Sequence, residues 1–568
     1  MRTEPEIPES PLIASYRFLF ALLLCVPFVL LGAEGCDPVP GSGPFQPPGE
    51  TEGDDDDGED DGEDDDDDDD DEGEDPGAPA DPPGEPEPEP EPEPPLVTGI
   101  TVTGISLYQA VEVPLVAPAV EGRASAAEET EADEDAVIVP VVAGRAALLR
   151  AFFTLDATWT MQTVHAEFVL HDGVSQVILG STLIPRADST ADDLDSTFNV
   201  EVPGALVTPL STVSVRLLAS DAGDDPGVDD GPREDAPGAT WPADGAAADL
   251  GAAENGGRLQ VRIVPLRYAP DGSDRLPDTS TEQIELMRSW LERLYPANDV
   301  VVTVDAPLAV AAPVLSNGNG WSDALYQLTD LREARAVPGD EYVYGMVAPD
   351  TSFNEYCRSG CVSGLGWRSS DATAAYTRTS LGLGYAGERA ADTFVHEIGH
   401  NHGRMHAPCG GPASPDPAYP HGDGRLGAWG YDHVEDALIS PTVHADMMGY
   451  CRPRWVSDYT WAALSDRIAW VNASASMEPA PGWPKRLRVM DVRADGLARL
   501  RGTLPVDRAP EGPSQKIEVL NRRGVVIDVI DGKQQLFEDN DSRAILFEEP
   551  TDLAAFAVRL PGGAPLTL

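Results

Sequence analysis

The chain has 568 residues and a formal net charge of −61, a length that suffices for about three to four domains. Residues 50–95 hold 27 Asp and Glu and no Lys or Arg, so a large acidic excess remains in the rest of the chain. Because an acidic surface repels phosphate backbones, this composition argues against nucleic acid as a partner.

The N-terminus predicts export. Residues 18–31 form an apolar run that follows Arg17 and is shorter than the roughly 20 residues that a membrane-spanning helix needs. We therefore interpret residues 1–36 as a signal peptide. Its last five residues, GAEGC, resemble a bacterial lipoprotein processing site, which would place a lipid on Cys36. We predict a lipoprotein of the bacterial outer membrane or cell surface, with secretion after simple cleavage as the alternative.

Residues 37–95 predict a disordered tether. The segment begins with Pro and Gly, continues as an Asp/Glu run and ends in Glu-Pro repeats. Such a sequence buries little apolar surface and repels itself, so it should stay extended and hold a folded body away from a membrane. Binding of Ca²⁺ is an alternative role, but the run lacks the Gly and terminal Glu spacing of an EF-hand loop.

Residues 96–250 predict an Ig-like β-sandwich followed by a linker or long loop at 221–256. Short runs rich in β-branched and aromatic residues alternate with Gly, Asp and Pro clusters. The expected strands are 100–107, 136–142, 147–153, 164–170 and 213–218. His165 and His171 stand alone in this region, and we interpret them as strand or loop residues.

Residues 257–475 alternate between strand and helix patterns, which predicts an α+β domain built on a twisted mixed sheet. The expected strands are 259–266, 300–304 and 342–347, and the expected helices are 281–295, 321–334 and a last helix that starts at Ser457 or Asp458 and reaches about Val471. We interpret 374–381 as an edge strand that pairs with an extended peptide, with an ordinary interior strand as the alternative.

The sequence HEIGHNHGRMH at 396–406 carries the candidate chemistry. Two histidines four residues apart project from one helix face, so His396 and His400 can reach one metal ion. Catalytic zinc takes three protein ligands and leaves one position for water. Gly403 permits a turn that returns His406 as the third ligand. Glu397, beside the first ligand, can take a proton from the water and pass it to the leaving amine.

This H-E-x-x-H-x-x-G-x-x-H string resembles the motif of metzincin zinc endopeptidases. The resemblance implies a methionine turn that floors the metal site, and residues 446–450 (DMMGY) fit such a turn with Met448 as its methionine. Tyr450 then takes the place of the tyrosine found in astacin-like and serralysin-like members. That place implies a fifth ligand or an oxyanion stabiliser, and plain packing is the alternative.

The same residues allow two other interpretations. A polar helix face with a merely structural histidine cluster is one. A thermolysin-like centre, whose third ligand is a glutamate from a later helix, is another, and Gly403 with His406 argues against it. His402 points away from the face shared by the ligands, so we interpret it as a supporting or surface histidine.

Four cysteines surround the motif and predict two disulfides, Cys357–Cys361 and Cys409–Cys451. The second bridge would brace both sides of the metal site, because it joins the segment after His406 to the segment after the methionine turn. A second zinc held by four thiolates is the alternative.

The pattern over residues 340–470 resembles bacterial secreted metzincins related to StcE-like proteases. Such enzymes cut mucin-type glycoproteins, but no glycan-reading site is recognisable in this sequence. The region 96–250 contains no cysteine, so a matrixin-style latency switch with a propeptide thiolate on zinc is not available there.

The C-terminal residues 476–568 predict a second β-sandwich, with strands at 487–492, 515–520, 525–530 and 555–560. The whole chain is thus expected to be multi-domain, with a metzincin catalytic domain between two β-sandwiches. Its predicted activity is hydrolysis of peptide bonds in extracellular proteins or glycoproteins with one catalytic Zn²⁺. The alternatives are a surface adhesin with a structural or inactive zinc site and a zinc hydrolase that acts on another bond.

Overall fold

The computed structural model describes residues 95–116, 137–219, 236, 238–310, 312–474, 480–493, 495–537 and 542–568. All of them belong to one compact unit, Pro90–Leu568. The expected signal peptide, Cys36 and nearly all of the acidic tether lie outside the described residues. Among the described residues, no helix is both long enough and apolar enough to cross a bilayer.

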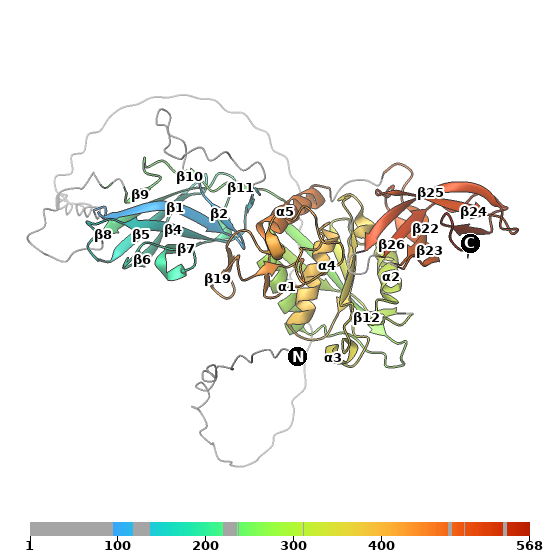
Figure 1. The fold of residues 1–568 in the computed structure, drawn as a ribbon. Helices are drawn as coiled ribbons and strands as arrows, with labels where there is room; N and C mark the ends of the chain where they lie inside the picture. Colours follow the sequence, from blue (N-terminus) through green and yellow to red (C-terminus); the bar gives the residue numbers. More distant parts are fainter. Residues whose placement is uncertain are drawn as a thin grey trace, which may run out of the picture. The chain divides into compact units, whose positions relative to one another are not determined.

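The first part of the unit consists of two antiparallel sheets that share one hydrophobic core (Figure 1). One sheet has the order β2-β1-β4-β7, with β1 (Ile100–Tyr108), β2 (Glu112–Pro114), β4 (Ala147–Leu155) and β7 (Phe198–Val202). The other has the order β10-β8-β5-β6 with β9 paired to β8, and contains β5 (Val164–His171), β6 (Gln176–Leu183), β8 (Thr212–Ala219), β9 (Thr240–Trp241) and β10 (Ala248–Asp249). Alternate residues of β5 are buried, as expected for a strand with one face on a core.

Some expected strands of this region differ from those in the structure. Within 136–142 only β3 (Val141–Val142) is a strand, paired with β11 (Ala252–Ala253). Three short strands, β9 to β11, lie within the span expected to be a linker, and β6 and β7 were not expected. Strands β9 to β11 have two residues each and β7 has five, too few for a periodic pattern to stand out in the sequence.

The central sheet has the order β13-β12-β15-β17-β16. Its strands are β12 (Arg258–Tyr268), β13 (Asp299–Val304), β15 (Glu341–Val347), β16 (Gly364–Arg368) and β17 (Thr379–Leu383), and β14 (Leu308–Val310) pairs with the end of β12. Neighbouring strands are parallel except for β16, which runs antiparallel to β17. This is the mixed sheet that the sequence predicts.

Helices cover both faces of this sheet (Figure 1). The helices are α1 (Thr281–Leu294), α2 (Trp321–Ala334), α3 (Phe353–Tyr356), α4 (Glu388–Asn401) and α5 (Asp458–Ala473). Side chains of β15 alternate between the two faces: Tyr342 and Tyr344 join the core of α1, α4 and α5, whereas Val343 and Val347 join the core of α2. The α4 helix, which carries His396 and His400, is thereby fixed against one face of the sheet.

The prediction of an edge strand at residues 374–381 is wrong. Strand β17 lies between β15 and β16, and residues 375–377 form a short 3-10 turn. The interior-strand alternative is the correct one. The edge position belongs to β16, and only part of β16 is free, since Trp367 and Arg368 pair with Phe537 and Leu536.

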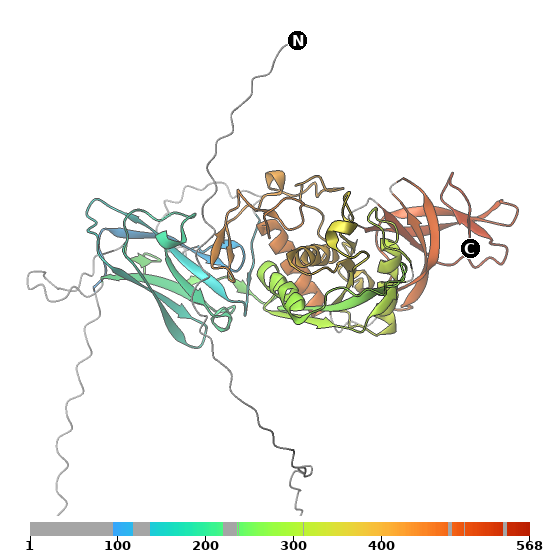
Figure 2. The ribbon, with the colours of Figure 1, turned by 90° about the horizontal axis from the view of Figure 1, so that it is seen from below.

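The C-terminal strands continue the central sheet beyond β16 and curve away from it (Figure 2). Their order is β23-β22-β26-β25-β24-β27-β28, with β22 (Lys485–Val492), β23 (Ala498–Val506), β24 (Ser514–Leu520), β25 (Val526–Phe537), β26 (Arg543–Phe547), β27 (Ala557–Arg559) and β28 (Leu566–Thr567). They enclose a small core of their own. The strand-rich prediction is confirmed, but in the described residues these strands form one hydrogen-bonded sheet with the central domain instead of two separate sheets.

The remaining short elements lie around the metal-binding motif or in turns. They are β18 (Gly430–Asp432), β19 (Ala437–Ile439), β20 (Ala445–Asp446), β21 (Arg454–Trp455) and the 3-10 turns Leu194–Ser196, Gly204–Leu206, Ala375–Thr377 and Gly422–Gly424. The parallel pair β20 and β21 brackets the methionine turn, so the turn is held at both ends by a two-stranded ladder.

Candidate metal centre

Two glycines shape the helix that presents the motif. Gly399 lies where a Cβ atom would overlap the sulfur of Met448, so only glycine lets the methionine turn pack this closely under α4. Gly403 has a φ of +84°, in the left-handed region that favours glycine, and a Cβ there would come within 2.6 Å of the Arg467 guanidinium. The predicted turn after the helix is therefore present.

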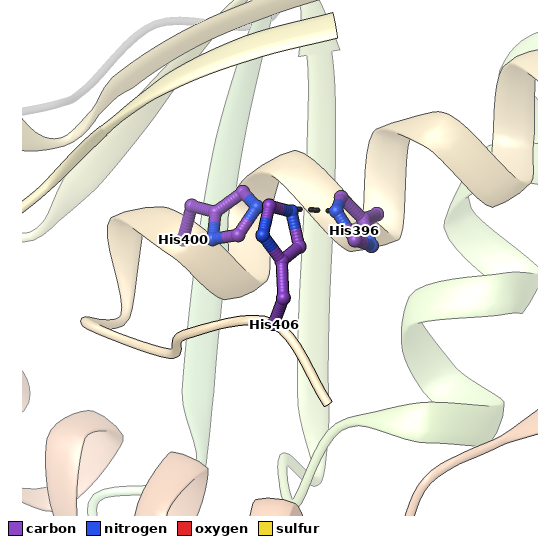
Figure 3. A group of neighbouring side chains, drawn as sticks. All are labelled: His396, His400 and His406. Carbon is purple, nitrogen blue, oxygen red and sulfur yellow. Dashed lines mark hydrogen bonds between the residues drawn. The ribbon is translucent and has the colours of Figure 1, made fainter. Parts of the chain in front are cut away.

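The three motif histidines converge on one point (Figure 3). One ligand-capable nitrogen from each of His396, His400 and His406 lies within 4.8 Å of the others, and all three side chains are buried. Figure 3 shows that the first two rings come from α4 and the third from the segment that follows it.

Each ring is oriented by a backbone carbonyl. The Nδ1–H groups donate to Met447 at 2.9 Å from His396, to Arg404 at 2.8 Å from His400 and to Ala413 at 3.0 Å from His406. A carbonyl only accepts, so each Nδ1 carries the proton and each Nε2 presents a lone pair. Ligand histidines of metal sites are oriented by this kind of hydrogen bond.

The chemistry of this donor set fits zinc. The Nε2 atoms of His396 and His400 are 3.1 Å apart. When both rings are neutral, the Nδ1–H groups are bound to carbonyls and two Nε2 lone pairs face each other at that distance, an arrangement that a shared cation stabilises. Three neutral imidazoles are a ligand set of catalytic zinc, which keeps a fourth position for water or substrate.

Glu397 follows His396 on α4 and lines the same cleft. Its side chain is 1% exposed, and it packs against β16, where a Cβ atom on Gly364 would overlap its Oε1. A Cβ on Gly366 would lie 3.3 Å from its Oε2. The Gly-x-Gly spacing of β16 therefore leaves the space in which this carboxylate lies, a role that the sequence alone does not reveal because β16 and α4 are separate elements.

The methionine turn supports the first histidine. Its core is Asp446, fully buried, whose carboxylate accepts from the backbone N–H of Met448 at 2.7 Å and of Ser457 at 3.0 Å. The N–H of Met447 donates to the carbonyl of Trp455 at 2.7 Å. The carbonyl of Met447, which orients His396, is thus fixed by bonds on both sides.

Tyr450 lies at the mouth of the site. Its hydroxyl is 3.2 Å from Nε2 of His406, and the residue is 40% exposed. Its ring also lies 5.1 Å from the His406 ring, so the residue both packs on this histidine and exposes its hydroxyl. This position is compatible with either of the two roles that the family resemblance implies.

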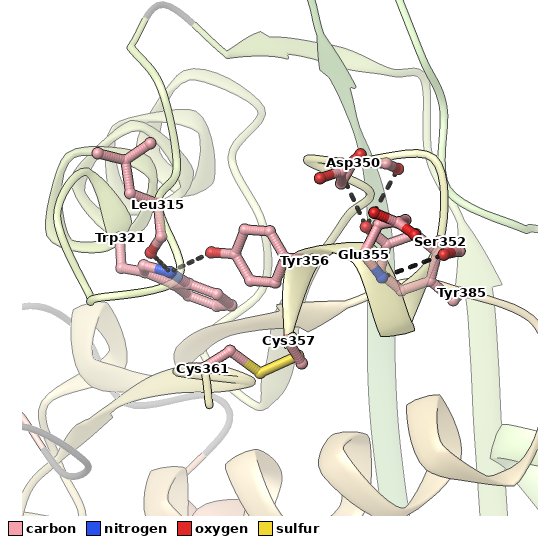
Figure 4. Close-up of a disulfide and its surroundings, with 9 residues drawn as sticks. All are labelled: Leu315, Trp321, Asp350, Ser352, Glu355, Tyr356, Cys357, Cys361 and Tyr385. Atoms are coloured by element: carbon pink, nitrogen blue, oxygen red, sulfur yellow. Dashed lines mark hydrogen bonds between the residues drawn. A yellow bond between two sulfur atoms is a disulfide. The ribbon is translucent and has the colours of Figure 1, made fainter. Parts of the chain in front are cut away.

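Both predicted disulfides are present in the structure. Cys409–Cys451 joins the segment after His406 to the segment after the methionine turn. Cys357–Cys361 closes the loop after α3, shown in Figure 4. There Tyr356 accepts a hydrogen bond from the Trp321 indole at 3.1 Å, and Tyr385 bonds the backbone of Asp350.

We interpret His402 from the sequence as a supporting or surface histidine, and the surface position is wrong. It is not a surface histidine: it is 2% exposed, stacks on the Tyr342 ring at 4.6 Å and donates to the carbonyl of Ile398 at 2.8 Å. Burial lowers the pKa of His402 to about 3, so this ring is neutral at neutral pH. It lies outside the three-histidine group and packs the far side of α4.

Asp392, in the second turn of α4, forms a buried ion pair. It is 4% exposed and pairs through Oδ2 with Arg452 and with Arg454, the latter at 2.9 Å. This pairing ties α4 to the chain after the methionine turn. Two signals in the sequence point to it: Asp392 precedes His396 by four residues on one helix face, and a basic pair follows Cys451.

A cleft of about 690 Å³ opens beside the ligands. It is lined by His396, Glu397, Tyr450, Arg452, Arg454, Glu388, Arg389, Asp392, Thr393, Phe353, Cys361, Val362 and Ser363. The candidate catalytic residues therefore face a space large enough for peptide side chains, and they are not sealed in the core.

Comparison with known families supports a metallopeptidase. Residues 367–455 match Peptidase M66. The matched span contains the three histidines, Glu397 and Tyr450. No curated protein matches the chain. The match and the convergence of three buried histidines together indicate a metal-dependent peptidase.

Proposed function

We propose that this protein is a zinc endopeptidase of the metzincin type, similar to StcE-like enzymes. The observation that carries the proposal is the geometry of His396, His400 and His406: three buried imidazoles, each fixed through Nδ1, with their Nε2 atoms turned toward one point at the edge of a cleft. Such fixed orientation is what a metal site requires.

The proposed mechanism assigns proton transfer to Glu397. The chemistry that a bound zinc ion supplies is polarisation of the scissile carbonyl and acidification of the attacking water. Glu397 takes the proton from that water and delivers it to the leaving amine. The hydroxyl of Tyr450, exposed at the cleft, donates to the oxyanion as the tetrahedral carbon forms. Gly364 and Gly366 leave the space that the Glu397 carboxylate occupies.

We also propose that the enzyme acts outside the cell on proteins or glycoproteins. The apolar leader, the GAEGC site with Cys36 and the acidic tether support export and a lipid anchor. The two disulfides support an oxidising compartment.

A protease assay separates this proposal from a binding role with an inactive metal site. The processed protein should cleave casein or gelatin, and a chelator should abolish cleavage, with recovery on addition of Zn²⁺. Absence of chelator-sensitive cleavage across a broad peptide library would instead favour an adhesin.

A further inference from the structure

We propose that the cleft beside His396 selects peptides with an acidic side chain next to the scissile bond. This inference rests on the proposed function, because it names the substrate class of the same site. It is drawn from two exposed arginines that line the cleft of an otherwise acidic chain.

Three arginines line the cleft: Arg389, Arg452 and Arg454. The lining carboxylates are Glu388, Asp392 and Glu397. The lining arginines and carboxylates are therefore equal in number. The chain carries a formal net charge of −61, so the cleft is less acidic than the chain as a whole, and its cationic character depends on which arginines are exposed and not already paired.

Arg389 presents its guanidinium to the cleft without a carboxylate partner in the described part of the chain. It is exposed, and its guanidinium carbon lies 4.7 Å above the Phe353 ring, which also lines the cleft. The ring fixes where the charge lies while leaving the N–H groups available. Phe353 belongs to α3, beside the loop that the Cys357–Cys361 disulfide closes, so the ring under the guanidinium lies next to a cross-linked segment.

Arg452 and Arg454 differ in how far their side chains are exposed to the cleft. Arg454 is 12% exposed, pairs with Asp392 and donates to the Cys451 carbonyl at 3.2 Å, so it is engaged within the fold. Arg452 also contacts Asp392, but its side chain is 59% exposed. Asp392 offers one oxygen to both arginines and neutralises only one of the two charges. The exposed guanidinium of Arg452 therefore remains able to bind a substrate carboxylate.

Arg389 and Arg452 thus approach the cleft from different elements, one from the start of α4 and one from the segment after the methionine turn. A carboxylate on the substrate would accept hydrogen bonds from planar guanidinium forks, which match it in shape and charge. A lysine side chain would instead meet two like charges. Because both arginines are solvent-exposed, we expect a preference of about tenfold and not several orders of magnitude.

The test uses quenched fluorescent peptides that are identical except for one residue, set to Glu, Gln or Lys on either side of the scissile bond. The wild-type protein should cleave the Glu peptide with about tenfold higher kcat/KM than the Gln peptide, and the Lys peptide least well. R389Q and R452Q should each bring the Glu/Gln ratio toward one. R493Q removes an exposed arginine of the C-terminal strands and should leave the ratio unchanged.

A binding measurement separates failure of this inference from failure of the proposed function. The same peptides are titrated onto the zinc-loaded E397A protein and followed by fluorescence anisotropy. Tighter binding of the Glu peptide, lost in E397A/R389Q, supports the subsite even if no peptide is cleaved by the wild type. Equal affinity for the three peptides, or a Glu/Gln ratio that R389Q and R452Q leave intact, overturns it. Chelator-sensitive cleavage of the Gln peptide at the same rate as the Glu peptide would keep the peptidase and reject the acidic preference.

Discussion

The Nε2 atoms of His396 and His400 lie 3.1 Å apart, each on a ring whose other nitrogen is bound to a backbone carbonyl. Neither ring can turn away without breaking its carbonyl bond, so the two lone pairs are held face to face. A cation between them, completed by His406, resolves that repulsion. The arrangement therefore links the orientation of the rings to the binding of metal.

Replacing His406 by Ala should remove zinc. Two imidazoles remain, and a two-ligand site does not retain the ion through dialysis, so we expect less than about 0.1 equivalent of zinc per chain by elemental analysis. His171→Ala is the matched control, because that histidine is exposed at the end of β5. Full zinc occupancy in His406→Ala would show that the third ligand is another residue.

Replacing Gly364 by Ala should impair catalysis while zinc stays bound. The added Cβ atom overlaps Oε1 of Glu397, and the carboxylate must move by about an ångström, which we expect to lower kcat/KM by roughly 100-fold. Gly502→Ala serves as control, because nothing lies within 4 Å of its Cβ position. Wild-type turnover in Gly364→Ala would mean that Glu397 does not act from its observed position.

Removal of the two disulfides should have unequal effects on stability. Cys409–Cys451 spans 42 positions and Cys357–Cys361 spans 4. Loop-closure entropy then predicts losses of about 4 and about 2 kcal/mol in the free energy of unfolding. Paired Cys→Ala variants, compared by denaturant titration, test the order. A larger loss for the shorter loop would contradict the entropic account.

Replacing Trp455 by Phe should destabilise the fold around the methionine turn. The Trp455 indole donates to the Ala110 carbonyl at 2.9 Å, and the Trp455 carbonyl accepts from Met447. Loss of this buried bond should cost about 1–3 kcal/mol. Trp290→Phe is the control, because the Trp290 Nε1 has no hydrogen-bond partner among the described residues. Equal melting temperatures for the two variants would argue against a stabilising role for the indole bond.

The features predicted best from the sequence depend on local spacing. The helix at 321–334 has the expected bounds, because the helical spacing of its apolar residues lies entirely within this one segment of the chain. The spacing of His396, His400 and His406 requires only a helix and a glycine turn to bring them together. The disulfides followed from the position of four cysteines around one motif.

The features that the sequence did not predict depend on partners far along the chain. Strand β17 is interior because β16, which precedes it in the chain, pairs with its other side. An apolar run has the same sequence pattern in an interior strand and in an edge strand, so the sequence does not distinguish the two positions. His402 is buried because Tyr342, 60 positions earlier, stacks on it. The pairing of β16 with β25 could not be read from either strand, since strand order is not encoded in a local pattern.

We propose that Glu397 transfers the proton in a zinc-dependent peptide hydrolysis. The most direct measurement compares wild-type and Glu397→Ala proteins for both zinc content and cleavage of a quenched fluorescent peptide. We expect one zinc per chain in both proteins, and a fall in kcat of at least about 100-fold in the variant. Full turnover by zinc-loaded Glu397→Ala would contradict the account.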